Sequence, residues 1–149
     1  MIAAVKNTPR PPAAVTARNP LRRTRTSDGL ATDEWPLISR LRVNALIVGA
    51  ASRTVDTSSM LGLAREQIAV QRGGRSLRLP TANCPPVLVL HDVDHLTLDE
   101  QCRLLAWLDD HLSVQVISTC RGPLTPLIDA GAFLANLYYR LNTVLLTVD

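Results

Sequence analysis

Residues 87–118 read VLVLHDVDHLTLDEQCRLLAWLDDHLSVQVIS, and this stretch decides the fold. The largely aliphatic runs at its two ends predict strands. Between them, Thr97 and Glu100 have the spacing of a capping box, which predicts a helix through about His111. Because the runs are nearly continuous in apolar residues, both faces of each strand are expected to be buried. The stretch therefore predicts a strand–helix–strand unit of a parallel sheet.

Strands and helices alternate outward from this unit along the rest of the chain. The predicted strands are 45–48, 87–90, 114–118 and 144–148. The predicted helices are a short one capped by Thr32, one over 57–72 that is stopped by Gly73 and Gly74, the helix of the capping box, and two over 124–130 and 133–141. The alternation predicts an α/β fold in three layers, with a mostly parallel sheet covered on both faces.

Length and composition favour a single domain with an aliphatic core. The 149 residues suit one ordinary domain, and 46% are hydrophobic while only 3% are aromatic. No apolar run is long enough to span a bilayer, and no secretory signal is visible. The three cysteines, Cys84, Cys102 and Cys120, have no paired spacing. We therefore expect a cytoplasmic protein with free thiols.

Charge divides the chain into two parts. Residues 1–30 carry six basic residues and one acid, whereas residues 31–149 carry ten basic and twelve acidic residues. Residues 1–30 also hold four of the ten prolines and show no hydrophobic period, which predicts a disordered basic arm before a domain at 31–149. Such an arm can bind nucleic acid phosphates, but it has no aromatic side chain to stack on bases. A solvated tail and an organelle transit peptide are the alternatives.

Ligands of parallel α/β sheets bind at the carboxyl ends of the strands, and the first such end is residues 49–58. A phosphate-binding loop there needs several glycines and a lysine. Only Gly49 is a glycine, and Lys6, in the arm, is the only lysine of the chain. Ser52 and Arg53 remain to attract a phosphate. The segment gives a poor signal for nucleotide binding.

The second strand end carries His91, Asp92, Asp94 and His95. Carboxylates at this position hold magnesium and orient water in nucleotide hydrolases of this architecture. Imidazole and carboxylate together also suit zinc or iron. Against a metal site, four such residues on a strand end do not all point one way. The alternative is a polar loop whose acids favour the start of the next helix.

The third strand end is residues 118–121, with small polar side chains that either sense a phosphate or finish the strand. Arg121 stands beside Cys120, where its charge could lower the pKa of the thiol. No histidine and acid are placed with this cysteine by local spacing. We therefore expect no cysteine nucleophile here.

Three stretches of the sequence carry a resemblance to a known family. VLVLHDVDHL at 87–96 is similar to T-L-F-L-D-E-I-G-E-L, and LDEQCRLLAWL at 98–108 is similar to L-E-L-Q-A-K-L-L-R-V-L. The most specific match is GAFLANLYYRLNTV at 131–144, which is similar to G-R-F-R-E-D-L-Y-Y-R-L-N-V-V. These motifs are those of the AAA+ domain of sigma-54-dependent transcriptional activators, the bacterial enhancer-binding proteins. The resemblance implies a P-loop NTPase (AAA+) type of fold.

The sequence departs from this family at the positions that carry its chemistry. The glycine-rich loop ending in G-K-E is absent from residues 49–58. The family's magnesium-holding aspartate corresponds to His91 and its catalytic glutamate to Asp92. Of two arginines that act across subunits, one corresponds to Leu134 and only Arg140 remains. The sigma-contacting G-A-F-T-G-A loop is missing, and the chain ends before the helical lid and the DNA-binding helix–turn–helix, so the resemblance implies a degenerate domain without its lid.

We interpret the chain as a non-catalytic regulatory or interaction protein, a pseudo-ATPase that requires no cofactor. Its expected partner is an AAA+ activator or a second copy. The remnant nucleotide-site residues are Gly49, Ser52, Arg53 and Asp92, with Asp92 and Arg140 as remnant catalytic candidates, and the expected interface residues are Phe133, Leu137, Tyr138 and Arg140. One alternative is a weakly active ATPase that uses ATP and magnesium. The other is a metal-binding protein through His91, Asp92, Asp94 and His95.

Overall fold

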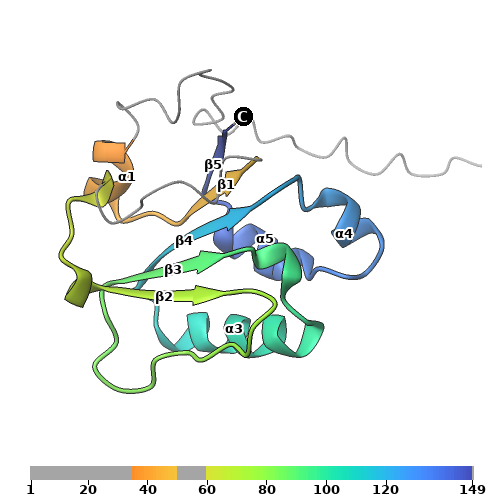
Figure 1. The fold of residues 1–149 in the computed structure, drawn as a ribbon, viewed down its shortest axis with the longest axis horizontal. Coiled ribbons are helices and arrows are strands. Elements are labelled where there is room, and N and C mark those ends of the chain that lie inside the picture. Colours follow the sequence, from red (N-terminus) through yellow and green to blue (C-terminus); the bar gives the residue numbers. More distant parts are fainter. Residues whose placement is uncertain (1–34, 50–59, 149) are drawn as a thin grey trace, which may run out of the picture.

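The computed structural model of the chain describes residues 35–49 and 60–148. Its strands run side by side in one sheet, with α1 and α3 on opposite sides of it (Figure 1). The elements in chain order are α1 (Trp35–Leu41), β1 (Ala45–Val48), η2 (Arg65–Gln67), β2 (Ile68–Arg72), β3 (Val87–His91), η3 (Val93–His95), α3 (Leu98–Asp110), β4 (Gln115–Cys120), α4 (Thr125–Asp129), α5 (Ala135–Leu141) and β5 (Val144–Thr147). The predicted arm at 1–30 and the Thr32 cap lie outside the described residues.

The sheet has five strands in the order β2-β3-β4-β1-β5, and every neighbouring pair is parallel. The first strand of the described chain, β1, therefore lies between β4 and β5. Parallel neighbours require crossover connections. The connections from β3 to β4 and from β4 to β5 carry helices, whereas the one from β2 to β3, residues 73–86, is irregular. The predicted parallel α/β sheet is confirmed, and all four predicted strands are present.

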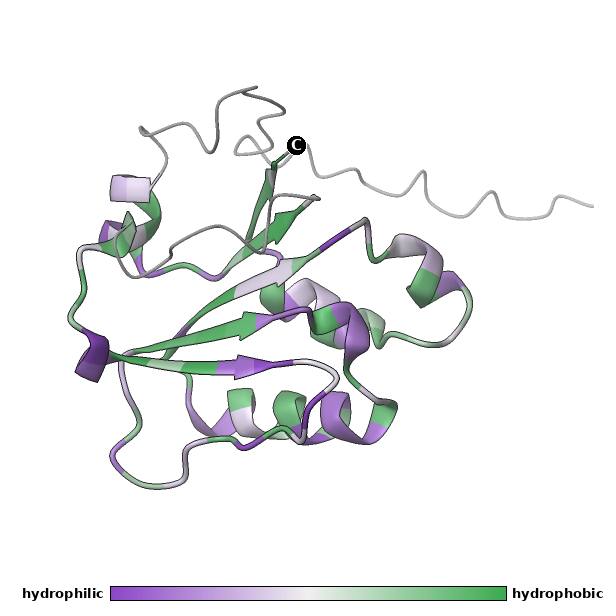
Figure 2. Ribbon diagram, in the orientation of Figure 1, coloured by the Kyte–Doolittle hydropathy of each residue, from purple (hydrophilic) through white to green (hydrophobic). Residues whose placement is uncertain are grey.

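Side chains of the strands enter two separate hydrophobic clusters, one on each face of the sheet. Leu46 and Leu88 belong to the cluster that α3 and α5 cover, whereas Ala45 and Ile47 belong to the cluster that α1 covers. Successive strand residues point to opposite faces, so a strand buried on both sides must be apolar throughout. Figure 2 shows this for β1 and β3, which are hydrophobic over most of their length. The three-layer prediction is confirmed.

The predicted helix over 57–72 is wrong from Gly62 onward, and its first three residues, 57–59, lie outside the described residues. Met60 and Leu61 are helical, but Gly62 follows in a turn with a φ of 63°. A left-handed glycine at this point is a common helix terminator. The chain then makes the short helix η2 and continues as the edge strand β2, paired in register with β3 from Ile68 opposite Val87. The glycines predicted to stop a helix instead end this strand.

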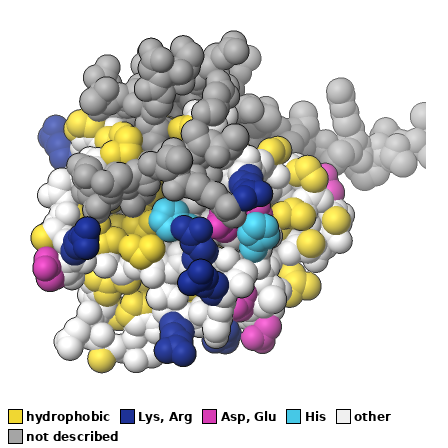
Figure 3. Space-filling model, viewed as in Figure 1, with side chains coloured by type: hydrophobic (Ala, Val, Ile, Leu, Met, Phe, Trp, Pro, Cys, Tyr) yellow, Lys and Arg dark blue, Asp and Glu magenta, His cyan; other side chains and the backbone are white. Residues whose placement is uncertain are grey.

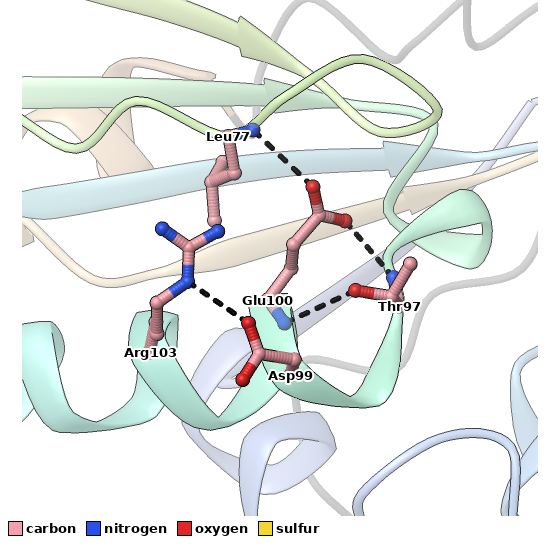
Figure 4. Close-up of polar contacts among 5 residues, drawn as sticks. All are labelled: Leu77, Thr97, Asp99, Glu100 and Arg103. Atoms are coloured by element: carbon pink, nitrogen blue, oxygen red, sulfur yellow. Dashed lines mark hydrogen bonds and ion pairs between the residues drawn. The ribbon is translucent and has the colours of Figure 1, made fainter.

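The predicted capping box is confirmed at the start of α3. The Thr97 hydroxyl accepts a hydrogen bond from the Glu100 backbone N–H at 3.2 Å, and the Glu100 carboxylate accepts one from the Thr97 N–H at 2.9 Å (Figure 4). The other carboxylate oxygen of Glu100 accepts a hydrogen bond from the Leu77 N–H at 3.2 Å. The cap therefore also holds the long connection between β2 and β3 against the helix.

Replacing Thr97 with alanine is expected to lower the free energy of unfolding by about 1 kcal/mol, because an N–H of the first helical turn loses its acceptor. Arg103→Ala on the same helix is the matched control, since the Arg103 side chain is solvent-exposed and its ion pair is with the exposed Asp99. Urea unfolding followed by circular dichroism measures both. Equal unfolding midpoints for the two variants would contradict the role of Thr97 as the N-cap of α3.

The remaining helices are short. The predicted helices over 124–130 and 133–141 are present as α4 and α5, which begin and end within those limits. Gly131, with a φ of 73°, makes the turn between them. None of the helices within 35–49 and 60–148 combines the length and the apolar character that crossing a membrane requires.

Candidate functional site at the carboxyl ends of the strands

The three strand ends predicted to gather polar residues are adjacent, because β3, β4 and β1 are neighbours in the sheet. Thr119 of β4 links two of them: its hydroxyl lies 3.2 Å from the Nδ1 atom of His91 and accepts a hydrogen bond from the Asp92 N–H at 3.4 Å. The Gly49 N–H, after β1, donates to the Cys120 carbonyl at 3.0 Å. Figure 3 shows histidine, basic and acidic side chains beside one another near the centre of one face.

Asp92 is the most buried charged residue of the site, with a relative exposure of 2%. Its backbone is left-handed, with a φ of 54°. Its carboxylate forms an ion pair of 3.4 Å with Arg72, which ends the edge strand β2. Sequence reasoning missed Arg72 because it placed this residue in a helix. The pairing of Arg72 opposite His91 is what brings the guanidinium to the site.

His91 faces β4 and Thr119. Burial lowers the pKa of His91 below its usual value, the positive charge of Arg72 lowers it further, and the negative charge of Asp92 partly offsets these effects. The imidazole is therefore neutral at pH 7. In one tautomer the Nδ1–H of a neutral histidine donates to the Thr119 hydroxyl, and in the other Nδ1 accepts from it.

Asp92, Asp94 and His95 bring one possible ligand atom each within 4.8 Å of one another. All three residues lie on one turn, since Asp92 precedes η3 and the other two belong to it. His91, the fourth residue of the predicted cluster, is not in this group and contacts Thr119 instead. The expectation that the four side chains would not all point one way is confirmed.

Cys120 is buried at the end of β4, and its thiol donates a hydrogen bond to the Gly122 carbonyl. Burial, together with the smaller effects of the negative charges of Asp94 and Asp92, raises the pKa of Cys120 to about 12. The suggestion that Arg121 lowers the pKa of this thiol is therefore wrong. A thiol in this state is protonated at neutral pH and is not a nucleophile.

Gly49 ends β1 at a close approach of two strands. Its φ is 140°, and a Cβ atom there would lie 1.6 Å from the Val148 carbonyl oxygen. The glycine thus allows the backbone after β1 to pass beside the end of β5. Ser52 and Arg53, the other predicted residues of this loop, lie outside the described residues.

The predicted interface segment divides between core and surface. Phe133 and Leu137 are buried in the core, so their side chains are unavailable to a partner. Tyr138 is half-buried and packs edge-on against Tyr139, which is 71% exposed. Arg140 forms an ion pair with Asp109 of α3. A contact made by this segment would therefore use Tyr139 and Arg140.

Comparison with solved structures relates the fold to AAA+ proteins. The structure of NtrX from Brucella abortus in complex with ADP has a TM-score of 0.60 at 17% identity, over 84% of this chain and 37% of that chain. RuvB from Thermotoga maritima has a TM-score of 0.56 at 14% identity, over 79% of this chain and 44% of that chain. The P-loop NTPase domain of a sigma-54 transport activator from E. coli has a TM-score of 0.55 at 17% identity, over 78% of this chain and 95% of that chain.

Sequence comparison gives the family itself. No curated protein sequence matches the chain. The profile of the sigma-54 interaction domain matches residues 76–149, which run from the connection before β3 to the end of the chain. These residues include the strand end with Asp92 and the Tyr-Tyr-Arg segment of α5. Residues 76–149 of this chain thus match the sigma-54 interaction domain, within a sheet that has the fold of AAA+ proteins.

Proposed function

We propose that this protein is a non-catalytic regulatory module of the sigma-54 activator family, which acts by binding an AAA+ activator or a second copy of itself. The observation that carries the proposal is the state of the β3 strand end. The resemblance aligns His91 with the family's magnesium-holding aspartate, and its neutral imidazole faces Thr119. A neutral imidazole supplies no charge to hold magnesium beside a triphosphate.

Asp92 gives further support to this proposal. The resemblance aligns it with the family's catalytic glutamate, but its carboxylate is buried and paired with Arg72. A base that activates water must reach the attacking water with a carboxylate oxygen, and burial together with the ion pair hinders this approach. A regulator of this kind would act in the cytoplasm, where bacterial transcription takes place.

A nucleotide titration tests the non-catalytic part of the proposal. A fluorescent ATP analogue is titrated into the full chain with and without magnesium, and ATP turnover is measured beside an active sigma-54 activator. We expect no saturable magnesium-dependent binding and no turnover above the background. Asp92→Asn, which keeps the side-chain shape, should give the same result as the parent.

The weakly active ATPase is the outcome that would contradict this proposal. Magnesium-dependent turnover that is lost in Asp92→Asn but kept in Asp110→Asn would establish it, since Asp110 is an exposed acid at the end of α3. Turnover that survives both substitutions would point to a contaminating enzyme, and the non-catalytic proposal would stand.

The binding part of the proposal rests on the exposed end of α5. Tyr139 offers a large exposed ring and is followed in the sequence by Arg140, and tyrosine and arginine are among the residue types most enriched at energetically important interface positions. Because Asp109 pairs with Arg140 on an exposed surface, this ion pair costs little to exchange for a partner's carboxylate.

Replacing Arg140 with alanine is expected to weaken self-association, or binding to the AAA+ domain of a sigma-54 activator, by about tenfold or more. Arg103→Ala is the control, because it also removes an arginine from an exposed ion pair with an aspartate. Sedimentation velocity over a concentration series, with and without the activator domain, measures both equilibria. Identical behaviour of parent, Arg140→Ala and Arg103→Ala would exclude this surface as the interface.

A further inference from the structure

We infer that Asp92, Asp94 and His95 form a binding site for a divalent transition-metal ion, with Zn²⁺ as the ion to test. The ligand atoms of these residues already lie within 4.8 Å of one another. Two ligands bound to the same ion at about 2.0–2.2 Å are no more than roughly 4.4 Å apart, so only a small side-chain adjustment separates this arrangement from a coordinated one. The site is independent of the proposed regulatory function and of any nucleotide.

The charges of the three residues favour a cation between them. Two carboxylates converge, and among the described residues the ion pair with Arg72 offsets only one of the two negative charges. The Oδ1 atom of Asp94 is buried and finds no hydrogen-bond donor in the described part of the chain. A buried carboxylate oxygen without a partner is costly, and a coordinated metal ion removes that cost.

The backbone that carries the three ligands is held by hydrogen bonds before any ion binds. Asp92 is fixed in its left-handed conformation by the His95 N–H, which donates to its carbonyl at 3.0 Å, and by the pairing of Gly73 with the preceding residue, His91, at 2.8 Å. A Cβ atom on Gly73 would lie 2.0 Å from the Asp92 carbonyl oxygen, so only glycine allows this approach. The metal site therefore requires no refolding of the loop.

The ligand types point to a transition metal. Imidazole suits zinc, iron, nickel and copper, whereas a site made for magnesium or calcium uses oxygen ligands. Arg72, which binds one Asp92 oxygen, acts as an outer partner that orients the ligating carboxylate, although its positive charge lowers the affinity. Three protein ligands leave coordination positions open to water or to a side chain of a partner.

Equilibrium dialysis and calorimetry with Zn²⁺ test the inference on the full chain, purified without a histidine tag and stripped with a chelator. The parent should bind one equivalent. Asp94→Asn and His95→Gln should each weaken binding by about tenfold or more, whereas His111→Gln, which changes a histidine stacked on Trp107, should leave it unchanged.

Two further measurements distinguish binding at these three residues from binding at the cysteines. Co²⁺ bound at the site should show no thiolate charge-transfer band, because none of the ligands is a cysteine. The metal-free Asp94→Asn protein should unfold at the same temperature as the parent or higher, since the substitution removes a charge that pairs with no cation in the described part of the chain, and only the parent should be stabilised by Zn²⁺. Equal Zn²⁺ affinity in the parent and both ligand variants, or a thiolate band with Co²⁺, would overturn the inference.

Discussion

Replacing Gly49 with alanine is expected to lower the free energy of unfolding by about 3 kcal/mol or more. The φ of 140° at this residue is a conformation that residues with a side chain rarely adopt, and the new Cβ atom would overlap the Val148 carbonyl oxygen. The overlap is with backbone on both sides, so no side-chain rotation relieves it. The end of β1 must then move away from β5, which breaks the hydrogen bond from the Val148 N–H to the Val48 carbonyl.

Gly122→Ala is the matched control for this substitution. Gly122 lies near the same edge of the sheet, just after β4, but an added Cβ atom there meets nothing within 4 Å and its φ lies outside the left-handed region. Its replacement should change the free energy of unfolding by less than about 1 kcal/mol. Thermal and urea unfolding of the two variants measure the difference. A Gly49→Ala protein as stable as Gly122→Ala would show that the backbone at Gly49 does not approach Val148 closely.

The stability of the Gly49→Ala protein also shows why a glycine follows β1. The sequence suggests a remnant of a phosphate-binding loop, in which a glycine allows the backbone to approach the phosphates of a ligand. The close approach to Val148 gives it a role in the fold itself. If Gly49 has this role in the fold, its replacement must lower the stability even in the absence of nucleotide.

Replacing Gln101 with leucine is expected to destabilise the protein by about 3 kcal/mol or more, although leucine is apolar and similar in size. Gln101 is fully buried on the inner face of α3. Its amide nitrogen donates to the carbonyls of Leu96 and Ala132, both at 3.0 Å, and its oxygen accepts from the Leu134 N–H at 2.8 Å. The substitution leaves three backbone groups without their partner, and each buried unsatisfied group costs about 1–3 kcal/mol.

Gln67→Leu is the control for Gln101→Leu, because it makes the same substitution at the surface. The Gln67 side chain is exposed and, within 35–49 and 60–148, accepts a single hydrogen bond, from the Ala64 N–H. Its replacement should change the stability by about 0.5 kcal/mol or less. Urea unfolding gives both values, and hydrogen exchange of the Leu134 amide gives a local reading. Protection of that amide in Gln101→Leu equal to the parent would contradict the assigned role.

Local pattern was enough for most of the fold. The strands β1, β3, β4 and β5 and the helix α3 were predictable because continuous apolar runs and a capping box are properties of neighbouring residues. The strand end with Asp92 and Asp94 was also predictable, since acids after an apolar run in an alternating α/β sequence fall at the carboxyl edge of the sheet.

The edge strand β2 shows where local pattern fails. Ile68 and Ala69 continue the helical spacing that begins at Met60, so the sequence favours one long helix. The register between Ile68 and Val87, residues far apart in the chain, selects a strand instead. Arg72 reaches Asp92 only as a result of this pairing, and the predicted site therefore lacked this cation.

The amino-acid sequence by itself determined the parallel α/β class, the capped helix and the candidate acids, because these depend on residues within one or two turns of one another. The tertiary structure alone decided that Phe133 and Leu137 are core, that Gln101 joins three backbone groups, and that Asp92, Asp94 and His95 converge while His91 turns to Thr119. The physical reason is that burial and convergence are set by which strands pair and which face a helix covers, and these contacts join residues that are distant in the chain.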